Sequence, residues 1–155
     1  MRRIAGLAGV GVLLVAALVV AATGAASGHG HHGKGKTIRV VERATTDTTV
    51  DNAPAGDSVG DLLAFGNELF DHRNATKVGT DQGSCVRTVP GEAFECTWTN
   101  SLAKGQITVQ GPFLDAGDST LAITGGTGAY RNARGTMDLH ARSATEFDFT
   151  FHLSR

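Results

Sequence analysis

Several features that would assign this chain to a familiar functional class are missing or scarce. Lys and Arg number 14 against 15 Asp and Glu, so there is no basic surplus to attract nucleic acid. Aromatic residues make up only 6% of the 155 residues, with one Trp and one Tyr. Between Gly105 and Gly135 no helix period interrupts the alternation of apolar and polar residues. These absences point away from nucleic-acid binding and from a helical domain.

Only two cysteines are present, and they fall on either side of a predicted turn at Pro90-Gly91. Counting outward from that turn pairs Val89 with Glu92 and Cys85 with Cys96, which places the two thiols opposite each other on neighbouring strands. A structural disulfide is therefore predicted, provided that the chain reaches an oxidising compartment. No spaced His partners lie near these cysteines, so we expect no metal site, and no cofactor is indicated.

The N-terminus has the layout of a secretory signal. Arg2 and Arg3 precede an apolar run over residues 4–22, and small residues follow up to Ala26. We therefore expect a signal peptide over residues 1–26, a secreted or extracellular protein, and no membrane association after cleavage. The apolar run is also long enough to span a bilayer, so an uncleaved anchor is the alternative. Residues 27–36, SGHGHHGKGK, are predicted to form a flexible leader.

The remaining chain, residues 37–155, has the pattern of a single all-β domain. Ile107 and Val109 alternate with polar residues, as do Leu121 and Ile123, and glycine-rich turns end both segments. Short turns between eight such segments favour an antiparallel up-and-down β-barrel, whose interior has room for one small ligand. Residues 47–56 form the longest irregular stretch and are expected to lie over one mouth of the barrel. The predicted strands are 37–45, 58–71, 77–89, 93–101, 105–113, 119–124, 135–142 and 145–153.

Four segments carry a family resemblance that covers nearly the whole of this domain. They are VGDLLAFGNELFD from Val59, VQGPF from Val109, LAITGGTGAY from Leu121 and EFDFTFHL from Glu146. Together they resemble the allene oxide cyclase and dirigent barrel superfamily. The resemblance implies an eight-stranded antiparallel β-barrel with a lipocalin-like layout, a homotrimer, and a lumen that binds an apolar small molecule.

Asn67 is the most informative polar residue of the second predicted strand. It shares a face with Leu63, Phe65 and Leu69, and a buried amide among apolar side chains must find a hydrogen-bond partner. The pattern alone leaves open whether that partner is structural or a ligand. In the resembled cyclases the matching asparagine faces the cavity and helps to hold a water against the substrate. The resemblance therefore gives Asn67 a catalytic role, and it assigns Glu42 to the stabilisation of positive charge.

Further cavity positions follow from the same resemblance. Leu63, Phe65, Pro112 and Phe113 match substrate-binding positions, and Cys85 matches the cysteine of the cyclase motif. Phe113 stands where a tyrosine is expected, so one hydroxyl is lost. The implied activity is that of an isomerase that promotes intramolecular cyclisation by holding one conformer of its substrate. The alternatives are a dirigent-like protein that steers radical coupling, and a carrier of an apolar metabolite without catalysis.

The last predicted strand separates its side chains into two faces. Phe147, Phe149 and Phe151 share one face, and Asp148 and His152 lie on the other. A solvated outer face is the simplest interpretation of the polar set, although a cluster of His, Asp and Glu is also compatible with metal binding or acid-base chemistry.

Overall fold

The computed structural model describes residues 35–154. The expected signal peptide and all but the last two residues of the expected leader lie outside this range. No helix within residues 35–154 is long and apolar enough to cross a membrane. The described part of the chain consists of ten strands and one short 3-10 turn, η1.

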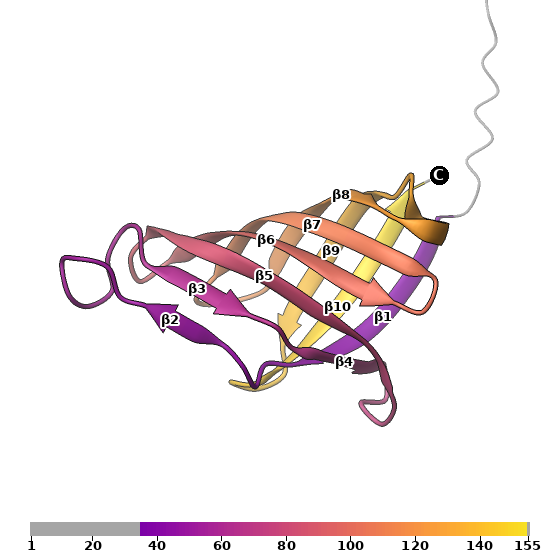
Figure 1. The fold of residues 1–155 in the computed structure, drawn as a ribbon, viewed down its shortest axis with the longest axis horizontal. Helices are drawn as coiled ribbons and strands as arrows, with labels where there is room; N and C mark the ends of the chain where they lie inside the picture. The colour runs from indigo at the N-terminus through magenta and orange to yellow at the C-terminus, as the bar shows by residue number, and fades with distance from the viewer. Residues whose placement is uncertain (1–34, 155) are drawn as a thin grey trace, which may run out of the picture. The chain divides into compact units, whose positions relative to one another are not determined.

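The strands form one closed antiparallel barrel (Figure 1). Strand β1 pairs with β10 on one side and with β4 on the other, and the pairing of β5 with β6 completes the ring. Strands β3 and β4 both pair with β5, and the two together fill one of the eight strand positions around the barrel. The bounds are β1 Lys36–Arg43, β2 Thr48–Val50, β3 Leu62–Phe65, β4 Glu68–Asp71, β5 Lys77–Val89, β6 Ala93–Leu102, β7 Gly105–Leu114, β8 Ser119–Gly126, η1 Gly128–Tyr130, β9 Arg134–Ala141 and β10 Glu146–Ser154.

The predicted eight-stranded up-and-down barrel is thus confirmed, with two local differences. The segment predicted as one strand over 58–71 begins at Leu62 and is interrupted at Gly66 and Asn67. The stretch predicted to be irregular contains β2, which pairs with β3. A three-residue strand is too short to show an alternation in the sequence, which explains why β2 was not foreseen.

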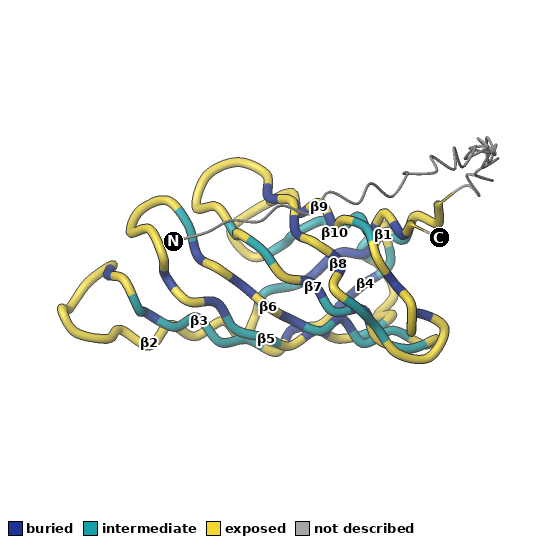
Figure 2. Tube along the Cα trace, turned by 90° about the horizontal axis from the view of Figure 1, so that it is seen from above, coloured by how far each residue is buried: buried dark blue, intermediate teal, exposed yellow. Residues whose placement is uncertain are grey.

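Alternation along the longer strands, such as β6, β8 and β10, places one face of each in the barrel interior, as the alternating colours of Figure 2 show. Phe149 and Phe151 are at most 1% exposed. The outward side chains of β10 contact those of β9 on the surface. His152 Nε2 lies 2.9 Å from Asp138 Oδ2, and both side chains are about half exposed. The solvated interpretation of this outer face is therefore supported.

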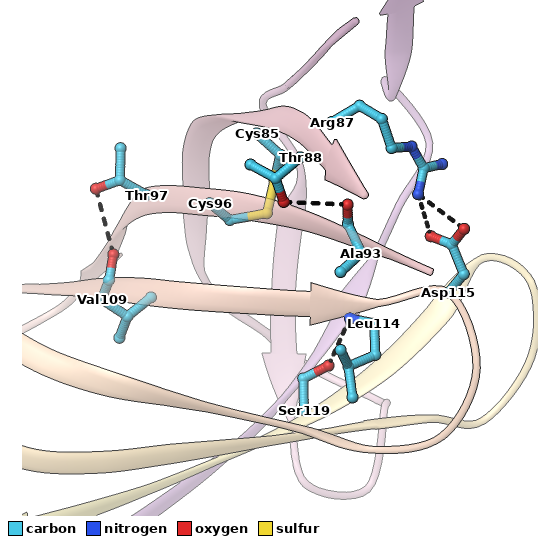
Figure 3. The surroundings of a disulfide bond; sticks show 10 residues. All are labelled: Cys85, Arg87, Thr88, Ala93, Cys96, Thr97, Val109, Leu114, Asp115 and Ser119. Carbon is cyan, nitrogen blue, oxygen red and sulfur yellow. Dashed lines mark hydrogen bonds and ion pairs between the residues drawn. A yellow bond between two sulfur atoms is a disulfide. The ribbon is translucent and has the colours of Figure 1, made fainter. Parts of the chain in front are cut away.

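The predicted disulfide joins Cys85 on β5 to Cys96 on β6, with their Cα atoms 4.0 Å apart (Figure 3). The two residues are directly opposed in the strand register. The predicted pairing nearer the turn is wrong by one residue, because a bulge at Thr88 makes Val89 face Ala93 instead of Glu92. The disulfide thus links two strands close to one end of the barrel.

Removing the disulfide should destabilise the barrel measurably. The two cysteines are 11 residues apart, and closing a loop of that length restricts the unfolded chain by about 3 kcal/mol. We expect the Cys85→Ala/Cys96→Ala variant to unfold at a clearly lower urea concentration, followed by the fluorescence of Trp98. A reductant should lower the midpoint of the wild type and leave that of the variant unchanged. Equal midpoints for oxidised wild type and variant would contradict a structural role.

Candidate functional site

A small cavity of about 40 Å³ lies inside the barrel near its disulfide-bearing end. Its buried part is formed by the disulfide, by two aromatic side chains, by Leu139 and by one acid, Glu42. Its more accessible part is formed by half-buried apolar side chains and by the exposed Asp47. The lining residues are Glu42, Asp47, Leu63, Phe65, Cys85, Cys96, Trp98, Phe113, Leu139, Phe147 and Phe149.

Gly83 allows the aromatic wall of this cavity to form. It lies between Phe65 of β3 and Trp98 of β6 in the strand register. A Cβ atom at this position would overlap Cβ of Trp98 and the carbonyl oxygen of Thr97, so only glycine fits. The rings of Phe65 and Trp98 meet edge to face with centroids 5.9 Å apart. The missing side chain at position 83 therefore leaves room for two rings to approach each other.

The polar part of the site is organised by Asn67, which is only 1% exposed. Its Nδ2 donates to Glu42 Oε1 at 2.9 Å and to Asp47 Oδ1 at 2.7 Å. Its Oδ1 accepts hydrogen bonds at 3.0 Å from the backbone N–H groups of Thr45 and Thr46 and from the Thr46 hydroxyl. Both donors of the amide and its acceptor are engaged by the protein itself. The geometry therefore supports the structural alternative, in which Asn67 positions the two acids.

Glu42 is held in an environment that favours its protonated form. It projects from β1 between Leu69 of β4 and Phe147 of β10 and is 6% exposed. Burial, reinforced by the nearby carboxylate of Asp81, raises its pKa to about 9. Burial also raises the pKa of Asp81, to about 6. The two carboxyl groups are in hydrogen-bond contact, so the pair retains a proton at neutral pH.

Asp81, the second member of this pair, is held by hydrogen bonds to Asn67. Its Oδ1 accepts the backbone N–H of Asn67 at 3.2 Å, and its backbone exchanges two hydrogen bonds with that residue. Its Oδ2 is buried and has no other hydrogen-bond partner in the described part of the chain. A proton on Glu42 directed at this oxygen satisfies both groups, because a carboxylic acid donates where a carboxylate accepts.

Four of the six residues predicted for catalysis or substrate binding line the cavity: Glu42, Leu63, Phe65 and Phe113. Asn67 lies behind the lining and contacts the cavity only through Glu42 and Asp47. Pro112 does not belong to the site. It is exposed on the outer face of β7, because it alternates with the half-buried Phe113. The structure thus brings five of the six together and leaves Pro112 outside.

Sequence reasoning missed Asp47, Asp81 and Trp98. Asp47 falls in the stretch that was expected over a mouth of the barrel, so the location was foreseen but not the residue. Asp81 and Trp98 lie inside strands β5 and β6, where alternation places them on the same inner face as the two cysteines. That alternation was a usable signal for both residues. Within residues 35–154 no three His, Cys, Asp or Glu side chains are arranged to hold a metal ion.

The cavity-bearing end of the barrel is fixed by a buried arginine. Arg87 is 8% exposed, and its Nη1 donates to both carboxylate oxygens of Asp115 at 2.7 Å (Figure 3). Its Nε lies 2.7 Å from Asp57 Oδ1, and its guanidinium stacks on the Phe94 ring at 3.6 Å. One cation therefore joins the loop before β3, the β5–β6 hairpin and the turn after β7.

The fold and the site together define a closed antiparallel barrel with an acid-bearing apolar cavity near one end. The family model of the allene oxide cyclases matches residues 38–154, and the chain belongs to this family. Among solved structures, one described as a pyocyanin demethylase is 25% identical, with a TM-score of 0.69, over 77% of this chain and 100% of its own.

Two further structures are similar in fold alone. An exo-specific intermolecular Diels-Alderase is 15% identical, with a TM-score of 0.62, over 78% of this chain and 98% of its own. A pterocarpan synthase dirigent protein is 18% identical, with a TM-score of 0.60, over 80% of this chain and 98% of its own.

The raised pKa of Glu42 predicts a characteristic dependence of stability on pH. In the unfolded chain this group loses its proton near pH 4.5, whereas in the fold it retains it up to about pH 9. The folded state therefore binds more protons in this window, and stability should fall as the pH rises, by up to about 1.4 kcal/mol per pH unit. Free energies of unfolding from urea titrations should show this slope in the wild type between about pH 6, above which Asp81 no longer contributes, and about pH 9, and a much flatter one in Glu42→Gln.

Glu42→Gln is a suitable probe because a glutamine keeps both interactions of the protonated acid. Its Oε1 can accept from Asn67, and its amide can donate to Asp81. Glu95→Gln is the matched control, since Glu95 is exposed on the outer face of β6. A slope that survives above pH 6 in Glu42→Gln would show that Glu42 is not its source.

Proposed function

We propose that the protein binds a small apolar molecule in this cavity and promotes its isomerisation or cyclisation, with Glu42 as the proton donor. The observation that carries the proposal is a buried carboxyl group, with a raised pKa, on the wall of an apolar cavity. Such a group donates a hydrogen bond or a proton at neutral pH, which an exposed carboxylate does not. This role replaces the stabilisation of positive charge that the family resemblance implied for Glu42.

The proposed reaction needs no co-reactant. Glu42 donates its proton to a ligand oxygen as a carbon–oxygen bond opens, and the same proton returns when ring closure is complete. Substrate and product therefore have the same mass. Asn67 is a positioning residue, because its amide sets the orientation of Glu42 without reaching the ligand. Leu63, Phe65 and Phe113 hold one conformer of the ligand in an environment with little water.

Ligand entry requires side chains at the mouth to move. The cavity of about 40 Å³ is far below the roughly 300 Å³ at which pockets for drug-sized ligands begin. Phe113 and Phe147 meet edge to face with centroids 6.1 Å apart, and both are only half buried. Rotation of half-buried rings of this kind is common on ligand binding. The ligand would therefore replace aromatic contacts between these rings with contacts to itself.

Conversion can be tested with neutral unsaturated epoxides generated in the assay. We expect wild-type protein to yield products of unchanged mass and altered chromatographic retention, with one enantiomer in excess. Glu42→Gln should be slower by about a hundredfold or more, because general acid catalysis typically contributes that much. Glu95→Gln should retain the wild-type rate. Full activity of Glu42→Gln would exclude the proposed proton donor, and recovery of every compound unchanged would favour a carrier.

A dirigent-like role is the second candidate, because Glu42 and Asp47 place an acid and a carboxylate in the same cavity. These two groups are suited to a phenol, whose proton one can accept while the other donates. In this role a separate one-electron oxidant generates the phenoxyl radicals and the protein orients their coupling.

Chiral chromatography of coupled products tests the dirigent-like role. We expect an excess of one enantiomer from a monophenol and a one-electron oxidant only when the protein is present. A racemic product at every protein concentration would remove this candidate.

The disulfide further supports the proposal that the protein acts in an oxidising compartment outside the cytoplasm. The expected homotrimer stays a prediction, to be checked by light scattering.

A further inference from the structure

We propose that this cavity selects planar aromatic molecules that are cationic, and disfavours anionic ones, with Asp47 at the mouth as the charged partner. The inference takes its location from the proposed function, since it concerns the same cavity. It adds a preference for the shape and charge of a bound molecule, which neither the fold nor the family determines. It concerns binding alone, since an aromatic cation is not a substrate of the proposed reaction.

The walls of the cavity present an unusual density of aromatic rings for a chain that is only 6% aromatic. Five of the lining side chains are Phe65, Trp98, Phe113, Phe147 and Phe149. Trp98 contacts two of them, with centroids 5.9 Å from Phe65 and 5.8 Å from Phe149. Flat aromatic ligands pack well against such rings, and ring faces attract cations.

All ionisable side chains that line the cavity are acidic. Glu42 and Asp47 are its ionisable members, and no Lys, Arg or His belongs to it among the described residues. Asp47 is exposed, and only its Oδ1 is used by Asn67 within the site. An anionic ligand would therefore meet a carboxylate at the entrance and find no cation inside to compensate its loss of hydration.

Two arginines close in sequence to lining residues, Arg43 and Arg87, are committed elsewhere. Arg43, next to Glu42, directs its guanidinium onto the Phe70 ring at 3.6 Å and to Asn74, to which it donates two hydrogen bonds. Arg87 is held by Asp57 and Asp115. Neither guanidinium is free to pair with an anion in the cavity.

A second and independent observation concerns Trp98, which lines the cavity. Trp98 is 4% exposed, yet its Nε1 has no hydrogen-bond partner among the described residues. A buried indole N–H without an acceptor is costly, and natural structures rarely leave one unpaired. A heteroatom of a bound aromatic molecule is a suitable acceptor for it.

The test compares three ligands of similar shape and different charge, each with an ether oxygen that can accept from Trp98 Nε1: 6-methoxy-N-methylquinolinium, 2-methoxynaphthalene and 6-methoxy-2-naphthoate. Binding to the full-length protein is measured by titration calorimetry, with the fluorescence of Trp98, the single tryptophan of the chain, reporting on the site. We expect the cation to bind about tenfold more tightly than its neutral counterpart, as a cation–π contact and an exposed ion pair together allow. Naphthoate should bind most weakly. Added salt should weaken the binding of the cation alone.

Asp47→Asn identifies the residue responsible. An asparagine keeps an oxygen that can accept from Asn67, so the network is retained while the charge is lost. The variant should reduce the preference for the cation to about twofold or less, without changing the affinity for 2-methoxynaphthalene. Asp118→Asn is the control, since it removes an exposed carboxylate from the turn after β7 that does not line the cavity.

The outcomes separate this inference from the proposed function. Equal or tighter binding of the neutral ligand or naphthoate, no binding of the cation, or a preference that survives in Asp47→Asn would each overturn the charge selection. None of these results bears on whether Glu42 transfers a proton, because the probes are not converted. Selective binding of the cation together with a failed conversion assay would support the inference and remove the proposed reaction.

Discussion

The hydrogen bonds of one buried amide hold the site together. A closed barrel turns every second residue inward, so a polar residue in an inward position must be satisfied inside the protein. Asn67 meets this requirement with five hydrogen bonds, which connect the loop after β1 to the junction of β3 and β4. Because Glu42 and Asp47 are both held by its Nδ2, the geometry of the acids depends on this single side chain.

The same constraint explains why an acid can remain protonated beside an apolar cavity. A buried carboxylate needs either a cation or several donors, and Glu42 has one donor, Asn67, together with the like charge of Asp81. The free energy of burying its charge exceeds that of retaining the proton, so the neutral form is preferred. The buried acid therefore lowers the stability of the fold at neutral pH. Residues with strongly shifted pKa values are often found at functional sites.

Much of the fold could be predicted from the sequence, because its signal is local. Strand alternation, glycine-rich turns and the two cysteines depend on neighbouring residues, and strand β5 coincides with its predicted range, 77–89. The site was predicted less completely because it depends on which residues of neighbouring strands are paired. Asp81 and Asn67 are opposed only because β4 and β5 pair with a shift between Leu69 and Phe70. Alternation assigns each to a face, but it does not determine which residues meet.

Pro112 illustrates the limit of reasoning from a motif. The match between QGP and the cyclase pattern was correct as an assignment of family, since the family model spans it. It did not identify a contact, because a strand directs adjacent residues to opposite faces and Phe113 takes the inward one. The motif therefore reports on strand β7, which carries part of the wall of the cavity. In the proposed function, the chemistry depends on the inward residues, above all on the buried acid Glu42, whose pKa is raised, and on Asp47 at the entrance.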